Sequence, residues 1–157
     1  MEKAFRSILE GLAPVLGLSE INTDASGLAC LLVIDDFEMS LRCLATGHVM
    51  LFTVIAPLPE NNRQKIMSSL LDGNTFYHQT QGFTLGARED TGVTLQGVIS
   101  LRVLDKDNVS SYVQNFINVA EYWQKFCLEC ADEAPATANP SLSRLPDDIR
   151  EMLYLRV

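Results

Sequence analysis

The feature that most constrains the fold of this chain is a series of three short apolar segments with strand periodicity. Only two tight turns separate them, which predicts a meander of antiparallel strands. The segments are residues 28–35, 38–45 and 48–56. Successive side chains of a strand point to opposite faces of the sheet, and apolar residues stand at both parities here. One face can therefore form a core, while the other has little polarity to offer to water.

The parity of the side chains assigns residues to these two faces. In the second segment Met39, Leu41 and Cys43 share one face, and Ser40, Arg42 and Leu44 share the other. The third segment is apolar on both sides, with the following division: Met50, Phe52 and Val54 on one face and Val49, Leu51 and Ile55 on the other. Helices can cover one of these faces, and the second then needs a partner.

The first predicted turn, Asp35-Asp36-Phe37, carries two adjacent acids. Paired carboxylates can serve catalysis or cation binding, but neighbouring residues of a strand point in opposite directions. Aspartate is also common in hairpin turns. We interpret Asp35 and Asp36 as a solvent-exposed corner. The second turn is Thr46-Gly47.

Helical periodicity predicts helices over residues 3–16 and 60–72, and a third that is capped by Asp105 or Asp107 and ends near Glu129. Two further strands are expected at 83–88 and 93–104. One face of the last strand must be buried, namely Val93, Leu95, Ile99, Leu101 and Val103. The predicted fold is α+β in the order α-β-β-β-α-β-β-α, a twisted antiparallel sheet with helices packed on it.

The domain boundary falls near residue 130. Residues 1–130 are expected to form one domain, and residues 131–157 an Ala/Pro-rich linker followed by a short amphipathic C-terminal helix. We hypothesise that this helix covers part of a groove or contributes a dimer contact through Leu145, Ile149, Met152 and Leu153.

Composition and charge exclude several classes of partner. The formal net charge of −8 disfavours binding to nucleic acid. The longest apolar runs, at 28–34 and 49–58, are far shorter than the ~20 residues of a membrane-spanning helix. The N-terminus predicts an amphipathic helix rather than a signal peptide. We therefore expect a cytoplasmic protein without a membrane partner.

Candidates for chemistry are few. His48 and His78 have no neighbours at metal-ligand spacing, so no metal is expected. The sequence also contains no phosphate-binding loop, so no cofactor is expected. Cys127 and Cys130 form a CxxC pair, but near the end of a helix, where the carbonyl dipole raises rather than lowers a thiol pKa. We expect no enzyme. A redox enzyme using this pair is the alternative that a double Cys→Ser variant would test.

The order of elements resembles the class I chaperones of bacterial type III secretion, the Tir-chaperone or CesT-like family. The resemblance covers residues 1 to about 130. It rests on these stretches: LGL at 16–18, SGLACLLVIDD at 26–36, PLPEN at 57–61, SLLDGN at 69–74 and FINVAEYWQKF at 116–126. Family members usually finish near the last helix, so residues 131–157 depart from the pattern.

The resemblance implies a cytoplasmic homodimer that binds an extended N-proximal segment of a secreted effector, without a cofactor, and keeps it soluble and competent for secretion. The same fold also serves regulatory chaperones that sequester a control protein, and contact with the ATPase of the secretion apparatus stays open. Implied dimer residues are Ile66, Met67, Leu70 and Leu71. Implied client-binding residues are Phe5, Ile8, Leu9, Leu12, Leu32, Leu41 and Leu51.

Overall fold

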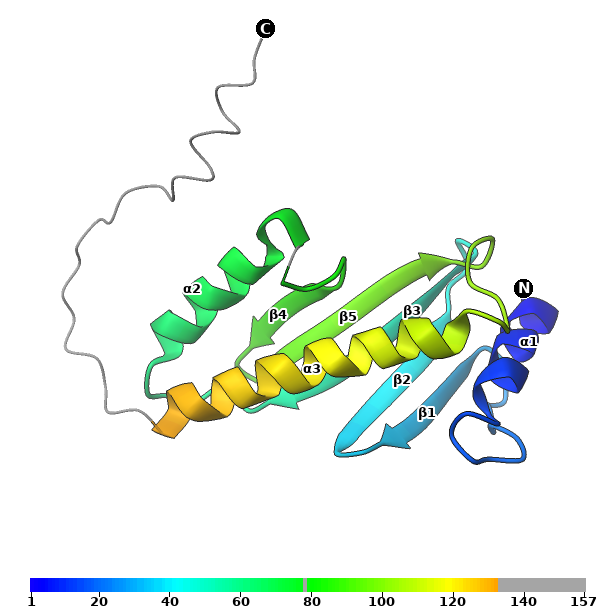
Figure 1. The fold of residues 1–157 in the computed structure, drawn as a ribbon, viewed down its shortest axis with the longest axis horizontal. Coiled ribbons are helices and arrows are strands. Elements are labelled where there is room, and N and C mark those ends of the chain that lie inside the picture. Colours follow the sequence, from blue (N-terminus) through cyan, green and yellow to red (C-terminus); the bar gives the residue numbers. More distant parts are fainter. Residues whose placement is uncertain (78, 133–157) are drawn as a thin grey trace, which may run out of the picture.

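The computed structural model of the chain describes residues 1–77 and 79–132. Its elements follow the predicted α+β order, with one added short 3-10 turn, η1 (Figure 1). They are α1 (Glu2–Leu12), β1 (Ala29–Ile34), β2 (Phe37–Cys43), β3 (His48–Ala56), α2 (Arg63–Asn74), η1 (Thr75–Tyr77), β4 (Thr84–Arg88), β5 (Gly92–Ser100) and α3 (Val109–Asp132). The predicted C-terminal helix, with Leu145, Ile149, Met152 and Leu153, lies outside the described residues.

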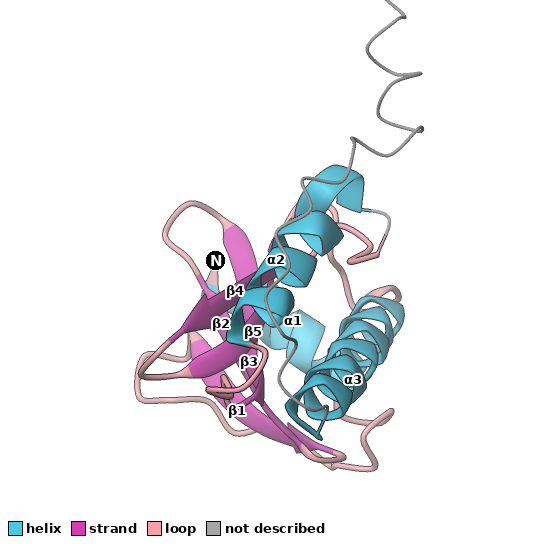
Figure 2. Cartoon of the chain, turned by 90° about the vertical axis from the view of Figure 1, so that its left-hand side faces the viewer, coloured by secondary structure: helices cyan, strands magenta, loops and turns pink. Residues whose placement is uncertain are grey.

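The five strands form one antiparallel sheet in the order β1-β2-β3-β5-β4, so β1 and β4 are its edges. All three helices lie on the same side of this sheet (Figure 2). We call the helix-covered side the inner face and the opposite side the outer face. The predicted meander of β1, β2 and β3 is therefore confirmed, with helices on one face only.

The inner face and the apolar stripes of the helices form the core. On α1 the stripe is Phe5, Ile8, Leu9 and Leu12, spaced so that all four lie on one side of the helix. The strands contribute buried residues of a single parity in β1 and β2, and in β2 they are the predicted set of Met39, Leu41 and Cys43. The inner-face residues are Cys30, Leu32, Phe37, Met39, Leu41, Cys43, Val49, Leu51, Val93 and Leu95.

The long helix α3 crosses the inner face and ties it to α2. The carboxylate of Asp105 accepts hydrogen bonds from the backbone N–H groups of Asp107 and Asn108, at 2.9 and 3.1 Å, just before the helix starts. This confirms Asp105 as the predicted cap. Near the other end, the Gln124 side chain donates to the Ile55 carbonyl at 3.2 Å and the Asn62 side chain donates to the Cys130 carbonyl at 2.9 Å.

Three local predictions were wrong. The first helix ends at Leu12 rather than at residue 16, because Pro14 has no N–H with which to continue it. Phe37 is not a turn residue: it pairs with Ile34 as the first residue of β2 and is buried. Val103 is 63% exposed, because the last strand stops at Ser100 and the chain turns, with the N–H groups of Val103 and Leu104 both donating to the Ser100 carbonyl.

Candidate functional site

The outer face of the sheet exposes a set of apolar side chains, and no helix within the described residues covers it. Leu31 and Val33 of β1 are 63% and 72% exposed, and Val54 on β3 and Val98 on β5 are exposed on the same face of the sheet. Met50 and Phe52, also on β3, are half-buried. The solvent-facing side of an antiparallel sheet normally carries polar residues. These exposed apolar side chains therefore indicate an interaction site.

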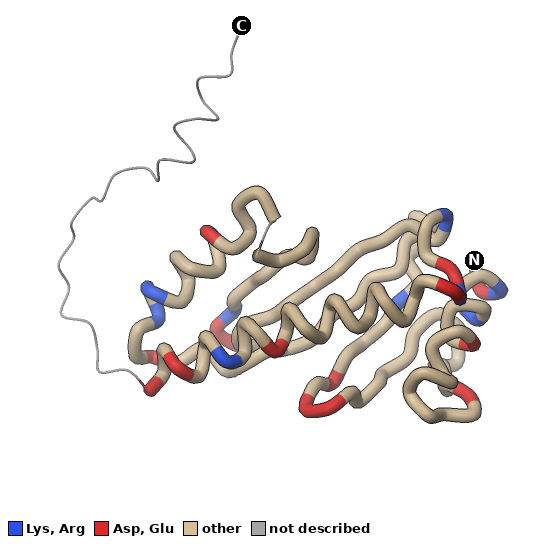
Figure 3. The backbone as a smooth tube through the Cα atoms, viewed as in Figure 1, with Lys and Arg blue, Asp and Glu red and all other residues tan. Residues whose placement is uncertain are grey.

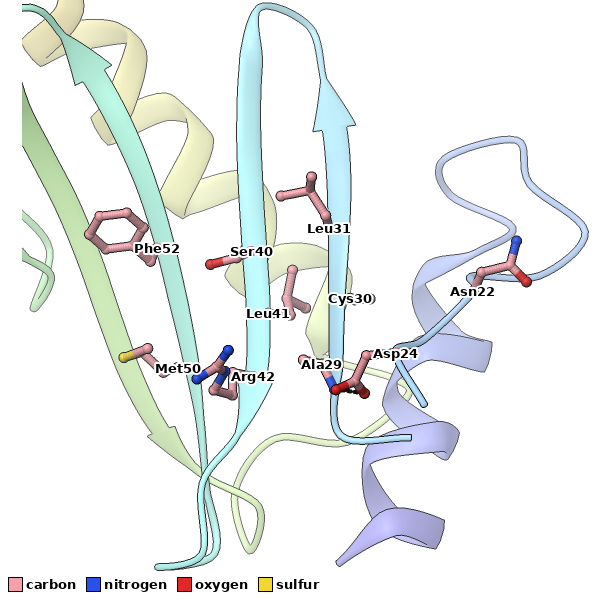
Figure 4. Close-up of a pocket in the computed structure, with 10 residues that line it drawn as sticks. All are labelled: Asn22, Asp24, Ala29, Cys30, Leu31, Ser40, Leu41, Arg42, Met50 and Phe52. Atoms are coloured by element: carbon pink, nitrogen blue, oxygen red, sulfur yellow. Dashed lines mark hydrogen bonds between the residues drawn. The ribbon is translucent and has the colours of Figure 1, made fainter. Parts of the chain in front are cut away.

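A shallow hollow of about 620 Å³ lies on this face, where β1, β2 and β3 run side by side (Figure 4). Its outer-face lining consists of Leu31, Ser40, Arg42, Met50 and Phe52. Cross-strand pairing sets these residues in rows, with Ser40 between Leu31 and Phe52, and Arg42 between Ala29 and Met50. The hollow thus combines apolar walls with a central polar line.

The exposed edge of β1 offers backbone hydrogen-bonding groups beside this hollow. The N–H of Cys43 donates to the Leu28 carbonyl, so in this antiparallel ladder the even-numbered residues of β1 face β2. The N–H and C=O groups of Leu31 and Val33 therefore point away from the sheet. A second hollow, of about 480 Å³, runs along this edge and is lined by Leu16, Leu18 and residues 31–35.

Asp24 covers the exposed edge of β1 at the N-terminal end of the strand. Its carboxylate accepts hydrogen bonds from the N–H groups of Leu28 and Ala29, both at 3.1 Å, and its own N–H donates to the Ala29 carbonyl. The Ser26 hydroxyl also donates to this carboxylate at 2.8 Å, and that bond is the largest of the effects that lower the Asp24 pKa. The edge available to a partner is therefore the stretch from Cys30 to Ile34.

The structure places the predicted client-binding residues in the core of the protomer. Each side chain is at most 6% exposed and points toward the inner face or its helices. The seven residues are Phe5, Ile8, Leu9, Leu12, Leu32, Leu41 and Leu51. Their contact with a client stays a prediction to which the burial gives no support. Their strand neighbours of opposite parity, which the prediction did not select, are the ones that face solvent.

The predicted dimer residues divide between two sides of α2. Ile66 and Leu70 are buried against the rest of the protomer, whereas Met67 and Leu71 are exposed, Leu71 by 69%. Met67 and Leu71 are four residues apart and therefore share the outward side of the helix. Only this second pair is available in the protomer for contact with another chain.

Two exposed aromatic residues follow directly after α2 in η1 and were missed at the sequence level. Phe76 and Tyr77 are both more than half exposed, and both have positive φ angles, 59° and 57°. Bulky residues rarely adopt this left-handed conformation. The only sequence signal was their position directly after a predicted helix, within a polar stretch that indicated a loop.

The cysteines and acids considered for chemistry have structural surroundings. Cys127 and Cys130 lie in the last two turns of α3 and are buried, and burial raises the pKa of the Cys127 thiol to about 11. Burial likewise raises the pKa of Cys30 to about 11. Such thiols are poorly reactive at neutral pH. Asp35 and Asp36 occupy the exposed β1–β2 turn, as predicted.

No group of three potential metal-ligating side chains occurs within residues 1–77 and 79–132. In the same part of the chain, no helix is both long and apolar enough to span a bilayer.

Comparisons with known proteins agree with this architecture. A chain of the ExsC–ExsE complex superposes with a TM-score of 0.66 at 23% identity, over 87% of this chain and 96% of that one. The HopA1–SchA chaperone–effector complex gives a TM-score of 0.62 at 17% identity, over 79% and 95% of the two chains. The ExoT–SpcS complex from Pseudomonas aeruginosa gives 0.60 at 19% identity, over 78% and 98%. At these identities the likeness establishes the fold.

No curated protein sequence matches this chain. The profile of the Tir chaperone protein (CesT) family, however, matches residues 7–124, which is most of the described fold. The chain therefore belongs to the Tir chaperone protein family, the class I chaperones of type III secretion.

Proposed function

We propose that this chaperone binds an extended N-proximal segment of a secreted effector along the exposed edge of β1 and the adjoining outer face, and so keeps that segment soluble and competent for secretion. We further propose that it does so in the cytoplasm, as a homodimer and without catalysing a reaction. The observation that carries the proposal is the coincidence, on β1, of outward-pointing backbone groups with the exposed side chains of Leu31 and Val33.

An extended client can continue the sheet at this edge. Its backbone would pair with Leu31 and Val33, and its alternate side chains would reach the outer hollow and the hollow beside Leu16 and Leu18. Backbone pairing is insensitive to sequence, while the hollows favour apolar client residues. The client would remain unfolded and shielded from aggregation as long as it is bound.

Dimerisation is proposed through the outward side of α2, with Met67 and Leu71 as the central contacts and Phe76 and Tyr77 as their continuation. All four side chains are exposed, and α2 lies at the end of the molecule opposite to α1 (Figure 1). In a two-fold dimer the same side chains of both protomers meet, so these residues would be buried against their own copies. The client edge on β1 lies across the sheet from α2, so both surfaces can be used at once.

The test is to identify by mass spectrometry what co-purifies with the full-length protein, and to measure its affinity for the recombinant N-proximal fragment of that protein. Val33→Pro removes one outward N–H without breaking the ladder with β2, and should weaken binding about tenfold. Val33→Ser loses the same side chain but keeps the N–H and serves as the matched control. Equal affinity of these two variants would rule out pairing at the edge.

The alternative client is a control protein of the secretion system rather than an effector. The same co-purification separates the two readings, because an effector is exported and a control protein acts inside the cell. The fold and the β1 edge are equally compatible with both clients.

A further inference from the structure

The outer face carries a charged line along β2 that separates two apolar columns. Glu38, Ser40 and Arg42 have the same parity and follow one another along this strand. Val33, Leu31 and Ala29 stand opposite them on β1, and Phe52 and Met50 stand opposite Ser40 and Arg42 on β3. The face is thus apolar on both sides of a line that is negative at one end and positive at the other.

The two charges of this line are not neutralised by each other. Glu38 and Arg42 are four residues apart in a strand, which separates them by about 13 Å. Both are exposed, and neither makes an ion pair within the described residues. The Arg88 side chain on β4 differs, because Asp90 binds it through two hydrogen bonds of 2.9 Å. Asp35 and Asp36 add negative charge at the Glu38 end, where the β1–β2 turn is red in Figure 3.

Covering Arg42 has a physical consequence for the partner. If a partner covers Arg42 between Ala29 and Met50 without supplying a hydrogen-bond acceptor, the guanidinium group loses its hydration and no interaction replaces it. A carboxylate at this point forms a charge-assisted hydrogen bond instead. The same reasoning at Glu38 requires a basic group.

We propose that the outer face selects client segments by a charge pattern: an extended stretch with one acidic and one basic residue four positions apart. This proposal rests on the proposed function, since it concerns the part of the same client that lies over the outer face of β2, not the part that pairs with the β1 edge. In an extended segment, residues i and i+4 point to the same side at the spacing of Glu38 and Arg42. A spacing of three directs one of the charges away from the face.

The test is selection of random 12-residue peptides displayed on phage against the immobilised full-length dimer and its variants. The native protein should enrich peptides with one acid and one base four positions apart, roughly three- to fivefold over those with a spacing of three, the upper part of the range expected for exposed ion pairs. R42E should shift the selected pattern to two bases, and E38R should shift it to two acids.

Two matched controls have the same change in net charge at exposed sites away from this face. Arg102→Glu lies in the turn after β5 and Glu10→Arg lies on α1. Both should select the native pattern. If no pattern is enriched, or if R42E and E38R select the same peptides as the native dimer, the proposal is overturned.

A variant that ends at residue 132 addresses the chain's own C-terminal segment, which contains both acidic and basic residues, among them Arg144 and Asp148. If the pattern appears only in this shortened protein, residues 133–157 occupy the face and an external client does not, which also overturns the proposal. The proposed function fails separately: binding of an effector fragment that persists in R42E and E38R with unchanged affinity leaves the chaperone role intact and removes only the charge selection.

Discussion

Leu31 and Leu32 are neighbours in β1 and chemically identical, yet one is 63% exposed and the other 6%. Leu32 belongs to the inner face, where helices complete its packing, and Leu31 belongs to the outer face, where nothing within the described residues covers it. The comparison shows that hydrophobicity in this strand serves two purposes. Half of the apolar side chains hold the protomer together, and the other half form a surface whose burial requires a second molecule.

The largest expected effect separates these two purposes directly. Leu32→Ala should lower the free energy of unfolding by about 2–4 kcal/mol, because it leaves a cavity against the helices. Leu31→Ala should lower it by less than about 1 kcal/mol, because its side chain already contacts water. Urea denaturation of the two variants measures the difference.

The same pair should rank in the reverse order when affinity for the client fragment is measured on the folded proteins. Comparable losses of stability in Leu31→Ala and Leu32→Ala would show that the outer face is covered in the folded molecule, and the contrast between the faces would be lost.

The exposed side of α2 extends the comparison to the proposed dimer. Leu71→Glu should weaken self-association about 100-fold, because the carboxylate would be buried in an apolar contact, while the fold of the protomer persists. Light scattering over a range of concentrations measures the association, and circular dichroism checks the fold.

Gln64→Glu adds the same charge to an exposed position of α2 and is the control for net charge. Unchanged association of Leu71→Glu would move the dimer contact away from this side of the helix.

The packing of α1 on the rest of the molecule depends on Gly11. A Cβ at this position would lie 2.4 Å from the carbonyl oxygen of Lys106, an atom of the backbone that cannot easily move away. Gly11→Ala should therefore destabilise the protein by about 1–2 kcal/mol, even though alanine is the better helix former. Thermal unfolding measures the effect, and Glu10→Ala on the exposed side of α1 is the control. A stabilised Gly11→Ala variant would mean that α1 does not pack here.

A dependence on pH is expected from two buried thiols, Cys30 on the inner face and Cys127 on α3. Burial raises the pKa of Cys30 and Cys127 from an ordinary value of 9.0 to about 11. The unfolded chain therefore releases these protons at lower pH than the folded one. Their contribution to stability is complete below pH 9 and is lost as the pH rises toward 11. Urea denaturation at pH 8, 9 and 10 measures this slope, which should be flatter in a C30A/C127A variant. Equal slopes would place both thiols in contact with water.

Much of this architecture follows from periodicity. The meander of three strands, the division of β2 and β3 into two faces, the apolar stripe of α1 and the cap at Asp105 depend on spacings of two or three to four residues, which short stretches of sequence display. The predictions that were wrong depend on where an element stops. Val103 continues the alternation of β5, but the chain has already turned at Ser100. Alternation alone does not show where a strand ends.

The amino-acid sequence by itself determined that the chain forms an α+β domain with more apolar strand surface than its helices can cover. Only the tertiary structure decided which half of that surface is covered. Leu31 and Leu32 are chemically identical, and Ile66 and Met67 are both apolar, yet their roles depend on the side from which α1, α2 and α3 approach. That side is set by long-range packing, such as Gly73 against the Trp123 ring and Gly11 against Lys106, which no local pattern encodes.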